Sequence, residues 1–380
     1  MATSSLSVLP HGYRRHSHGV FLLLLFLWQQ QLLWSSAGAT QLNHSLIDQL
    51  NISIPALFVF GDSTVDPGNN NYLPTAFKGN FPPYGLSFSN HIPSGRFTDG
   101  KLATDFLVSY LGIKELVPPY LDFTLGVHDL LTGVSFASAG SGYDPLTAQS
   151  TSVLPVNQQL NYMKDCLARM ESAVGKARAA KIMEESIFLV SAGTNDFVIS
   201  YFLFPLRRRT FNLEQYQLFI IDQLQVFIKG LYDLGARRIL FAGLPPLGCL
   251  PIEMTINFAN AVLRQCIDSL NLVAVSYNSK LQHMLNKVKE SELKDANIVY
   301  ADIYEPLLDA IKNPNKYGFK QTNVGCCGTG LLEFGLLCNP NTLVCADPST
   351  YVFWDAIHPT QRTYSLIADA LIQRVLHLIL

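Results

Sequence analysis

The chain alternates between short apolar runs and longer stretches that have the hydrophobic spacing of helices. Each apolar run has five residues, mostly β-branched, aliphatic or aromatic, as expected for a strand that is buried on both faces. The runs are residues 56–60, 133–137, 186–190, 238–242 and 297–301. This alternation predicts an α/β domain with a five-stranded parallel sheet that helices cover on both faces.

Five stretches have helical spacing, and two segments fit no regular element. The predicted helices are residues 101–111, 156–178, 213–234, a long stretch near 257–290, and 361–379. The first irregular segment, residues 67–98, is rich in glycine, asparagine, proline and aromatics; the second, residues 326–345, holds four cysteines. A loop as long as 67–98 inside a compact domain is usually functional, although plain surface packing would also explain it.

The first 40 residues have the pattern of a secretory signal peptide. Arg14 and Arg15 form a basic region, and an apolar run of nine residues follows at 20–28. Small residues at 37–39 supply a cleavage site. A membrane anchor is the alternative, but three glutamines at 29–31 end the apolar run well short of the ~20 residues that a span needs.

We therefore predict a signal peptide at residues 1–39, no transmembrane segment and an extracellular location. Residues 40–380 are predicted to form a single domain, because α/β folds of this length are often undivided. Asn43 and Asn51 each begin an N-x-S sequon that the secretory route can glycosylate.

The charge balance and composition exclude one class of partner and allow a large core. The chain has 27 Lys and Arg against 29 Asp and Glu, a formal net charge of −2, and no long basic block. We therefore expect no binding to nucleic acid. At 48% hydrophobic and 15% charged residues, the chain can bury a sizeable core.

At least two disulfides are predicted among the seven cysteines, because disulfides are the default in a secreted chain. Their clustering pairs Cys249 with Cys266 and predicts a further set within residues 326–345. Cys166 stands alone in a helical stretch and is the candidate for the free thiol. A zinc site is the alternative, but the spacings are not of the paired C-x2-C type and no histidine is interleaved.

Reactive side chains follow the apolar runs at four places, where an open α/β sheet collects its functional groups. They are Ser63, Gly140, Asn195 and the pair Asp355 and His358. Each has a plain structural alternative. Ser63 and Asn195 would serve as helix caps, Gly140 would suit any tight turn, and the Asp–His pair would be satisfied locally at a helix start.

Taken together, the four places have the chemistry of a serine hydrolase. A carboxylate three residues before a histidine can accept its Nδ1–H, which leaves Nε2 free as a base for a serine hydroxyl. A glycine N–H and an asparagine amide can hold an oxyanion. The G-x-S-x-G pattern is absent around Ser63, which argues against the nucleophile elbow of α/β-hydrolases.

The blocks around these residues resemble the GDSL esterase/lipase family of the SGNH-hydrolase superfamily. Ser63 lies in a G-D-S block, Gly140 in F-A-S-A-G, Asn195 in G-T-N-D and His358 in D-x-x-H-P. The resemblance runs from about residue 54 to the C-terminus. Longer strings are similar to the plant extracellular branch of the family, which suggests the apoplast or cell wall as location; they are residues 61–71, 94–100 and 352–355.

This resemblance implies a flavodoxin-like three-layer α/β/α sandwich that hydrolyses esters without a metal or an organic cofactor. Ser63 would be the nucleophile and His358 its base, and Asp355 would orient His358. The N–H groups of Ser63 and Gly140 and the amide of Asn195 would form the oxyanion hole. Gly133 and Gly142 lie close in sequence to Gly140 and are alternatives for the oxyanion glycine.

Two other functions use the same residues or the same scaffold. Acyl transfer needs only a sugar or alcohol hydroxyl in place of water, and the same residues would serve it. A catalytically silent binding protein is the other alternative, against which the intact Ser63, Asp355 and His358 argue. Lipid, cutin-like polyester, acetylated polysaccharide and small phenolic esters all fit as substrates, and the sequence predicts no oligomeric state.

Overall fold

The computed structural model describes residues 53–257 and 261–380. Within it, residues Ile54–Leu380 form a compact unit. The predicted signal peptide at residues 1–39 and the sequons at Asn43 and Asn51 lie outside the described residues. None of the helices in the described ranges combines the length and the apolar content that a membrane span needs.

The main sheet of the described residues has four parallel strands in the order β1-β2-β3-β4. The strands are β1 (Leu57–Gly61), β2 (Ile187–Ser191), β3 (Arg238–Ala242) and β4 (Asn297–Ala301). Each pairs in register with its neighbour, and β1 and β2 are buried over their full length. The apolar runs are therefore strands because both faces of the sheet are covered by helices.

Residues 133–137, the remaining predicted strand, lie beside β1 but do not form a regular ladder. The Val59 N–H donates to the Val134 carbonyl (3.0 Å), and the Phe136 N–H donates to the Val59 carbonyl (2.7 Å). Ser135 also bridges to Pro119 on its other side. Further bonds to β1 run from the Leu57 N–H to the Thr132 carbonyl (3.5 Å) and from the Ser138 N–H to the Gly61 carbonyl (3.0 Å), but only Val59 and Ser135 form a β-bridge between β1 and this segment. The predicted strand is therefore an extended segment bonded to β1, but it is not a fifth regular strand of the sheet.

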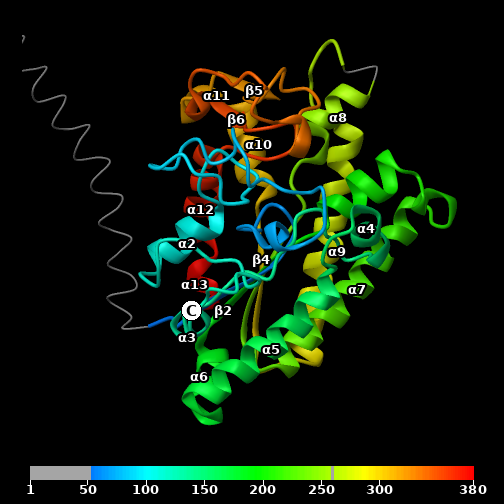
Figure 1. Ribbon diagram of the computed structural model, residues 1–380. Coiled ribbons are helices and arrows are strands. Elements are labelled where there is room, and N and C mark those ends of the chain that lie inside the picture. The colour runs from blue at the N-terminus through cyan, green and yellow to red at the C-terminus, as the bar shows by residue number, and fades with distance from the viewer. Residues whose placement is uncertain (1–52, 258–260) are drawn as a thin grey trace, which may run out of the picture. The chain divides into compact units, whose positions relative to one another are not determined.

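Helices cover the sheet on two sides, so that the unit has three layers (Figure 1). Helices α5, α7 and α9 lie on one face, and α2, α12 and α13 lie on the other. The helices are α2 (Ala103–Tyr110), α3 (Val127–Leu131), α4 (Pro145–Thr151), α5 (Val156–Val174), α6 (Lys176–Glu185), α7 (Leu213–Asp233), α8 (Pro251–Ile256), α9 (Asp268–Ser291), α10 (Tyr304–Lys312), α11 (Pro314–Tyr317), α12 (Gln361–Arg374) and α13 (Leu376–Ile379).

Three predicted helices differ from those observed. The stretch 156–178 is two helices, α5 and α6, because Gly175 adopts a φ of +82° that ends the first one. In the stretch near 257–290, the described residues 261–267 are not helical and contain the disulfide-bonded Cys266, and α9 begins at Asp268. The last helix is interrupted at Val375, between α12 and α13.

The irregular segment 67–98 is anchored by a buried ion pair. The Arg96 guanidinium donates to Asp105 through two hydrogen bonds of 2.8 Å, and both side chains are buried. Arg96 also donates to the carbonyls of Pro67 (3.3 Å) and Val117 (2.9 Å). The Arg96 guanidinium thus bonds both Asp105 oxygens and two backbone carbonyls. This ion pair holds the C-terminal end of the segment 67–98 against α2.

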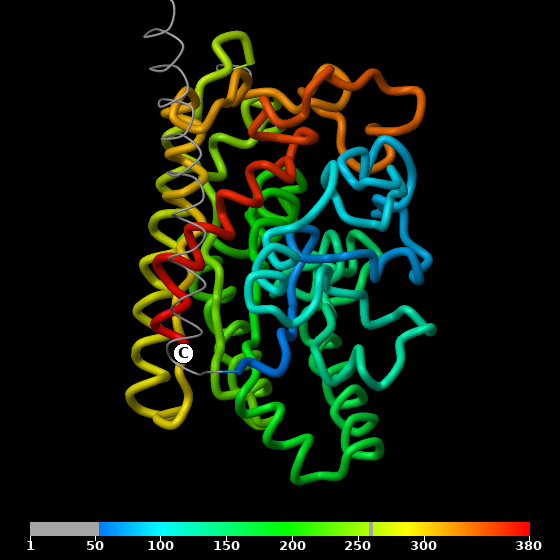
Figure 2. Tube along the Cα trace, turned by 90° about the vertical axis from the view of Figure 1, so that its left-hand side faces the viewer, coloured from blue at the N-terminus to red at the C-terminus, as the bar shows by residue number. Residues whose placement is uncertain are grey.

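The segment 326–345, which we call the cysteine-rich cap, is closed by two disulfides, Cys326–Cys345 and Cys327–Cys338. The predicted Cys249–Cys266 disulfide is also present, and Cys166 is a buried free thiol. A two-stranded parallel sheet that the sequence did not predict, β5 (Gln321–Gly325) and β6 (Tyr351–Phe353), flanks the cap. The cap lies beside the segment 67–98 at one end of the unit (Figure 2).

Helix α8 contains a buried carboxyl group that forms no ion pair among the described residues. Glu253 is 2% exposed, and its Oε1 has no hydrogen-bond partner among the described residues. Burial raises the pKa of this carboxyl from 4.5 to about 7. The native state therefore holds a proton that the unfolded chain releases, so the free energy of unfolding falls as pH rises from about 4.5 to 7.

We predict that Glu253→Gln removes this penalty, because the amide stays neutral at every pH. The thermal midpoint of the variant should exceed that of the wild type by a few degrees at pH 8 and should match it at pH 5. Glu184→Gln, at an exposed position of α6, is the control and should change neither midpoint. An equal difference at both pH values for Glu253→Gln would show that the carboxyl is ionised throughout.

Candidate active site

Ser63 lies just past the carboxyl end of β1, on a turn that requires glycine before it. Gly61 has a φ of +140°, and a Cβ there would come within 1.8 Å of the Ser191 carbonyl oxygen. The Gln159 side chain fixes both backbone groups of this residue, since its Oε1 accepts the Gly61 N–H (2.8 Å) and its Nε2 donates to the Gly61 carbonyl (2.9 Å). The turn therefore presents Ser63 with little conformational freedom.

The structure brings Ser63, His358 and Asp355 together in one chain of hydrogen bonds. Ser63 Oγ lies 2.8 Å from His358 Nε2, and His358 Nδ1 lies 2.8 and 2.9 Å from the two Asp355 oxygens. The Asp355 carboxylate also accepts the backbone N–H groups of Ile357 (2.9 Å) and His358 (2.7 Å). With Nδ1–H donating to Asp355, Nε2 is left to accept the Ser63 hydroxyl proton.

Tyr84 adds a further donor to Asp355, and sequence reasoning missed it. Its hydroxyl donates to Asp355 Oδ2 (3.0 Å) and accepts the Gly335 N–H of the cysteine-rich cap (2.8 Å). Burial, with the nearby Asp355 charge, raises the pKa of Tyr84 well above its usual value, so the hydroxyl keeps its proton. The only signal in the sequence was the position of Tyr84 in the long segment 67–98.

The end of that segment also packs against His358. The Phe97 ring lies 5.0 Å from the imidazole, measured between ring centroids. Thr98 Oγ1 donates to the Pro359 carbonyl (2.9 Å), and Asp99 accepts the Gln361 N–H (2.7 Å). The segment therefore fixes the imidazole face and the backbone that follows it.

The residue before the serine, Asp62, is a buried carboxyl. Its Oδ1 accepts the Thr64 N–H (3.0 Å) and the Thr64 hydroxyl (2.8 Å). Burial raises the pKa of Asp62 to about 6, against the lowering effects of these bonds and of His358. Among the described residues, no cluster of three or more His, Cys, Asp or Glu side chains is placed to hold a metal ion.

Gly140 is held near this turn by polar side chains that follow Ser63 in the chain. Asp66 accepts the Ala139 N–H (2.9 Å), and the Asn70 amide donates to the Ala139 carbonyl (2.9 Å). The Asn69 amide donates to two carbonyls of the extended segment before it, those of Ser135 and Ala137 (both 2.8 Å). These bonds clamp the backbone that leads to Gly140, which has a φ of +87°.

The two alternative glycines have other structural roles. Gly133 lies at the opposite end of its extended segment, where a Cβ would come within 2.1 Å of the Leu57 carbonyl oxygen. Gly142 packs against the Asp196 carboxylate, and a Cβ there would come within 2.2 Å of it. Both glycines are therefore explained by close packing.

Asn195 lies next to the Gly140 loop. Its Nδ2 donates one hydrogen to the Ser141 carbonyl (2.9 Å), which orients the amide. The second Nδ2 hydrogen has no acceptor among the described residues. The backbone N–H groups of Ser63 and Gly140 also donate to no atom of the described residues. Three donors from three separate segments are thus available at this end of the sheet, as an oxyanion hole requires.

Comparison with known proteins gives one consistent result. GDSL esterase/lipase At5g45960 of Arabidopsis thaliana is 52% identical over 82% of this chain and 84% of its own length. GDSL esterase/lipase At1g06990 of the same plant is 45% identical, covering 88% and 92%. GDSL esterase/lipase At2g40250, also from Arabidopsis thaliana, is 44% identical, covering 89% and 96%.

A family model described as GDSL-like lipase/acylhydrolase matches residues 57–371. This range begins with β1 and ends in α12, so it contains the Ser63 turn, the Gly140 and Asn195 loops and the Asp355–His358 pair. The order of the blocks, the fold and the similarity to these relatives agree: the chain belongs to the GDSL-like lipase/acylhydrolase family.

Proposed function

We propose that this carboxylic ester hydrolase is a secreted serine esterase or lipase in which Ser63, His358 and Asp355 carry out catalysis. The observation that supports it most directly is the 2.8 Å contact between Ser63 Oγ and His358 Nε2, with Asp355 on the other imidazole nitrogen. Nucleophile, base and orienting group then stand in the order that covalent ester hydrolysis needs.

In the first half-reaction, Ser63 Oγ attacks the ester carbonyl carbon while its proton passes to His358 Nε2. The carbonyl oxygen becomes an oxyanion that accepts from the N–H groups of Ser63 and Gly140 and from the Asn195 amide. The tetrahedral intermediate collapses, the bond to the alcohol oxygen breaks, and His358 gives its proton to the leaving alcohol. The acyl group is left as an ester on Ser63.

In the second half-reaction, water replaces the alcohol. His358 Nε2 takes a proton from the water as its oxygen attacks the acyl carbon, and the same donors hold the second oxyanion. The bond to Ser63 then breaks, the proton returns to Ser63 Oγ, and the carboxylic acid leaves. Asp355 holds the Nδ1–H throughout, so that the imidazole keeps the tautomer that both steps need.

Disulfides and the predicted leader support secretion. The described residues contain three disulfides, which form and persist in oxidising compartments. Together with the signal peptide predicted at residues 1–39, they support a location outside the cell, where Asn43 and Asn51 would carry glycans. Esters met there include lipids, cutin-like polyesters and acetylated polysaccharides.

The first test removes the nucleophile. Ser63→Ala should lower kcat for a p-nitrophenyl ester by at least about a thousandfold while leaving the thermal midpoint close to that of the wild type. A fluorophosphonate probe should label the wild type at Ser63, as mapped by peptide mass, and should not label the variant. Near-normal turnover by Ser63→Ala would refute this mechanism.

The second test concerns the role of Asp355. Asp355→Asn should lower kcat by about a thousandfold or more, because an amide can hold His358 in the wrong tautomer. If Asp355 served only to stabilise the loop before α12, the variant would lose thermal stability while turnover per folded molecule stayed unchanged. Measuring the thermal midpoint and kcat on one sample separates the two roles.

The third test concerns Tyr84 as a positioning residue. Tyr84→Phe removes a hydrogen bond to a charged group, which is worth about 1.5–3 kcal/mol. We expect kcat to fall by about tenfold with KM unchanged, since Asp355 would then hold His358 less firmly. Tyr232→Phe is the matched control, because the Tyr232 hydroxyl also donates to a carboxylate, that of Asp295 (2.5 Å), which precedes β4 at the opposite end of the sheet. Equal kcat values for the two variants would remove Tyr84 from this role.

A further inference from the structure

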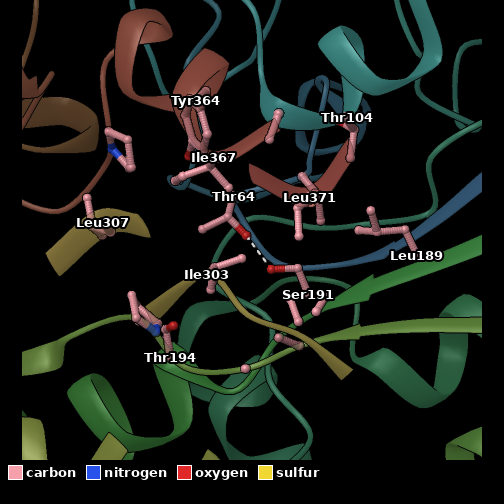
Figure 3. Close-up of a pocket in the computed structure, with 18 of the residues that line it drawn as sticks. Thr64, Thr104, Leu189, Ser191, Thr194, Ile303, Leu307, Tyr364, Ile367 and Leu371 are labelled. Carbon is pink, nitrogen blue, oxygen red and sulfur yellow. Dashed lines mark hydrogen bonds between the residues drawn. The ribbon is translucent and has the colours of Figure 1, made fainter. Parts of the chain in front are cut away.

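An apolar cavity lies between the carboxyl ends of the strands and the helices α2 and α12 (Figure 3). Its volume is about 70 Å³. Leu189 of β2, Ile303 after β4 and Leu371 of α12 point into it from different elements. Small residues at the strand ends, among them Ala242 and Ala301, leave the space open.

The cavity is lined by chain neighbours of the proposed catalytic residues, although Ser63, His358 and Asn195 do not themselves line it. Thr64, which follows Ser63, lines it, and so do Ile357 and Pro359 on either side of His358. Thr194, which precedes Asn195, lines it as well. Consecutive Cα atoms are about 3.8 Å apart, so the cavity wall lies within one residue of the nucleophile, the base and an oxyanion donor.

The cavity offers few polar contacts to a ligand. None of the described residues that line it carries a charge. The hydroxyls of Thr64 and Ser191 lie at its centre in Figure 3, but they bond to each other (2.9 Å), and Thr64 also donates to Asp62. A sugar or glycerol unit would lose its hydrogen bonds to water there, whereas an aliphatic chain would lose none.

We propose that this cavity binds the acyl chain of the substrate and that the enzyme prefers aliphatic acyl groups of about four to eight carbons, because the cavity has room for about five to seven water-sized spheres. The inference rests on the proposed function, in which the acyl group stays on Ser63 while the alcohol leaves and water enters. An enclosed site suits the acyl group, because this group stays on Ser63 through both half-reactions. An acetyl group would leave the cavity unfilled, and a hexadecanoyl chain would exceed it.

The experiment measures kcat/KM for p-nitrophenyl esters from acetate to palmitate. Each methylene that enters the cavity should raise kcat/KM by about fourfold, the equivalent of ~0.8 kcal/mol, until the cavity is full. The wild type should therefore favour hexanoate over acetate by about two-hundredfold, because hexanoate has four more methylenes, and kcat/KM should decline again at palmitate. A profile that is flat from acetate to octanoate would overturn the proposal.

Two variants change the volume of the cavity from opposite walls. Ala242→Leu should lower the hexanoate-to-acetate ratio by at least about tenfold, and Leu371→Ala should move the optimum to longer chains. Leu224→Ala deletes a buried side chain of α7, on the other face of the sheet, and should keep the wild-type ratio even if it is less stable. If one of these two variants fails to fold, the acyl-length profile of the other still tests the proposal.

Two further measurements separate this proposal from the proposed function. A series of alkyl acetates varies the alcohol at fixed acyl length; if the cavity variants change preference in that series instead, the cavity binds the alcohol and the proposal is wrong. Fluorophosphonate labelling at Ser63 is followed in every variant. Normal labelling with an unchanged acyl-length profile overturns the cavity assignment alone, whereas labelling at another residue overturns the proposed function.

Discussion

The site depends on the Asp355 carboxylate, because both oxygens of a fully buried carboxylate need hydrogen-bond donors. An isolated carboxylate in an apolar interior costs several kcal/mol, so every oxygen needs donors. Asp355 obtains them from its own loop, from the His358 imidazole and from Tyr84, whose hydroxyl is 271 residues away in sequence. Tyr84 in turn accepts the Gly335 N–H of the cysteine-rich cap. One buried charge therefore ties two irregular segments to the imidazole.

Irregular backbone near the site is held by buried side-chain amides and carboxylates in place of a sheet ladder. Gln159 bonds the backbone N–H and the carbonyl of Gly61. The backbone before Gly140 is bonded by the side chains of Asp66, Asn69 and Asn70. A β-ladder would satisfy the same groups but would impose extended geometry. Side-chain clamps allow the positive φ angles at Gly61 and Gly140 while leaving few buried groups unpaired. The turn at Ser63 and the loop at Gly140 are thus positioned by buried polar side chains.

The sequence predicted those parts that depend on local patterns. Continuous apolar runs located the four strands of the sheet, since a strand buried on both faces has no polar alternation to obscure it. The helix break at Gly175 was missed, because the surrounding residues keep helical spacing and only the backbone dihedral marks the end. Tyr84 was missed for a different reason. Its role depends on a contact between distant segments, and no periodicity or spacing within 67–98 distinguishes it from the other aromatics there.

The cavity was also invisible in the sequence, for a reason that bears on substrate choice. A strand-end alanine such as Ala242 or Ala301 belongs to an apolar run as readily as a leucine does, so the hydrophobic pattern is the same whether the space is filled or open. The volume depends on the opposing side chains, here Leu371 of α12. The proposed catalytic residues are polar or glycine and occur in recognisable sequence blocks. The apolar residues that line the cavity differ from other core residues only in size. If the cavity binds the acyl chain as we propose, a single change in volume at Ala242 or Leu371 would alter acyl preference while leaving every catalytic block intact.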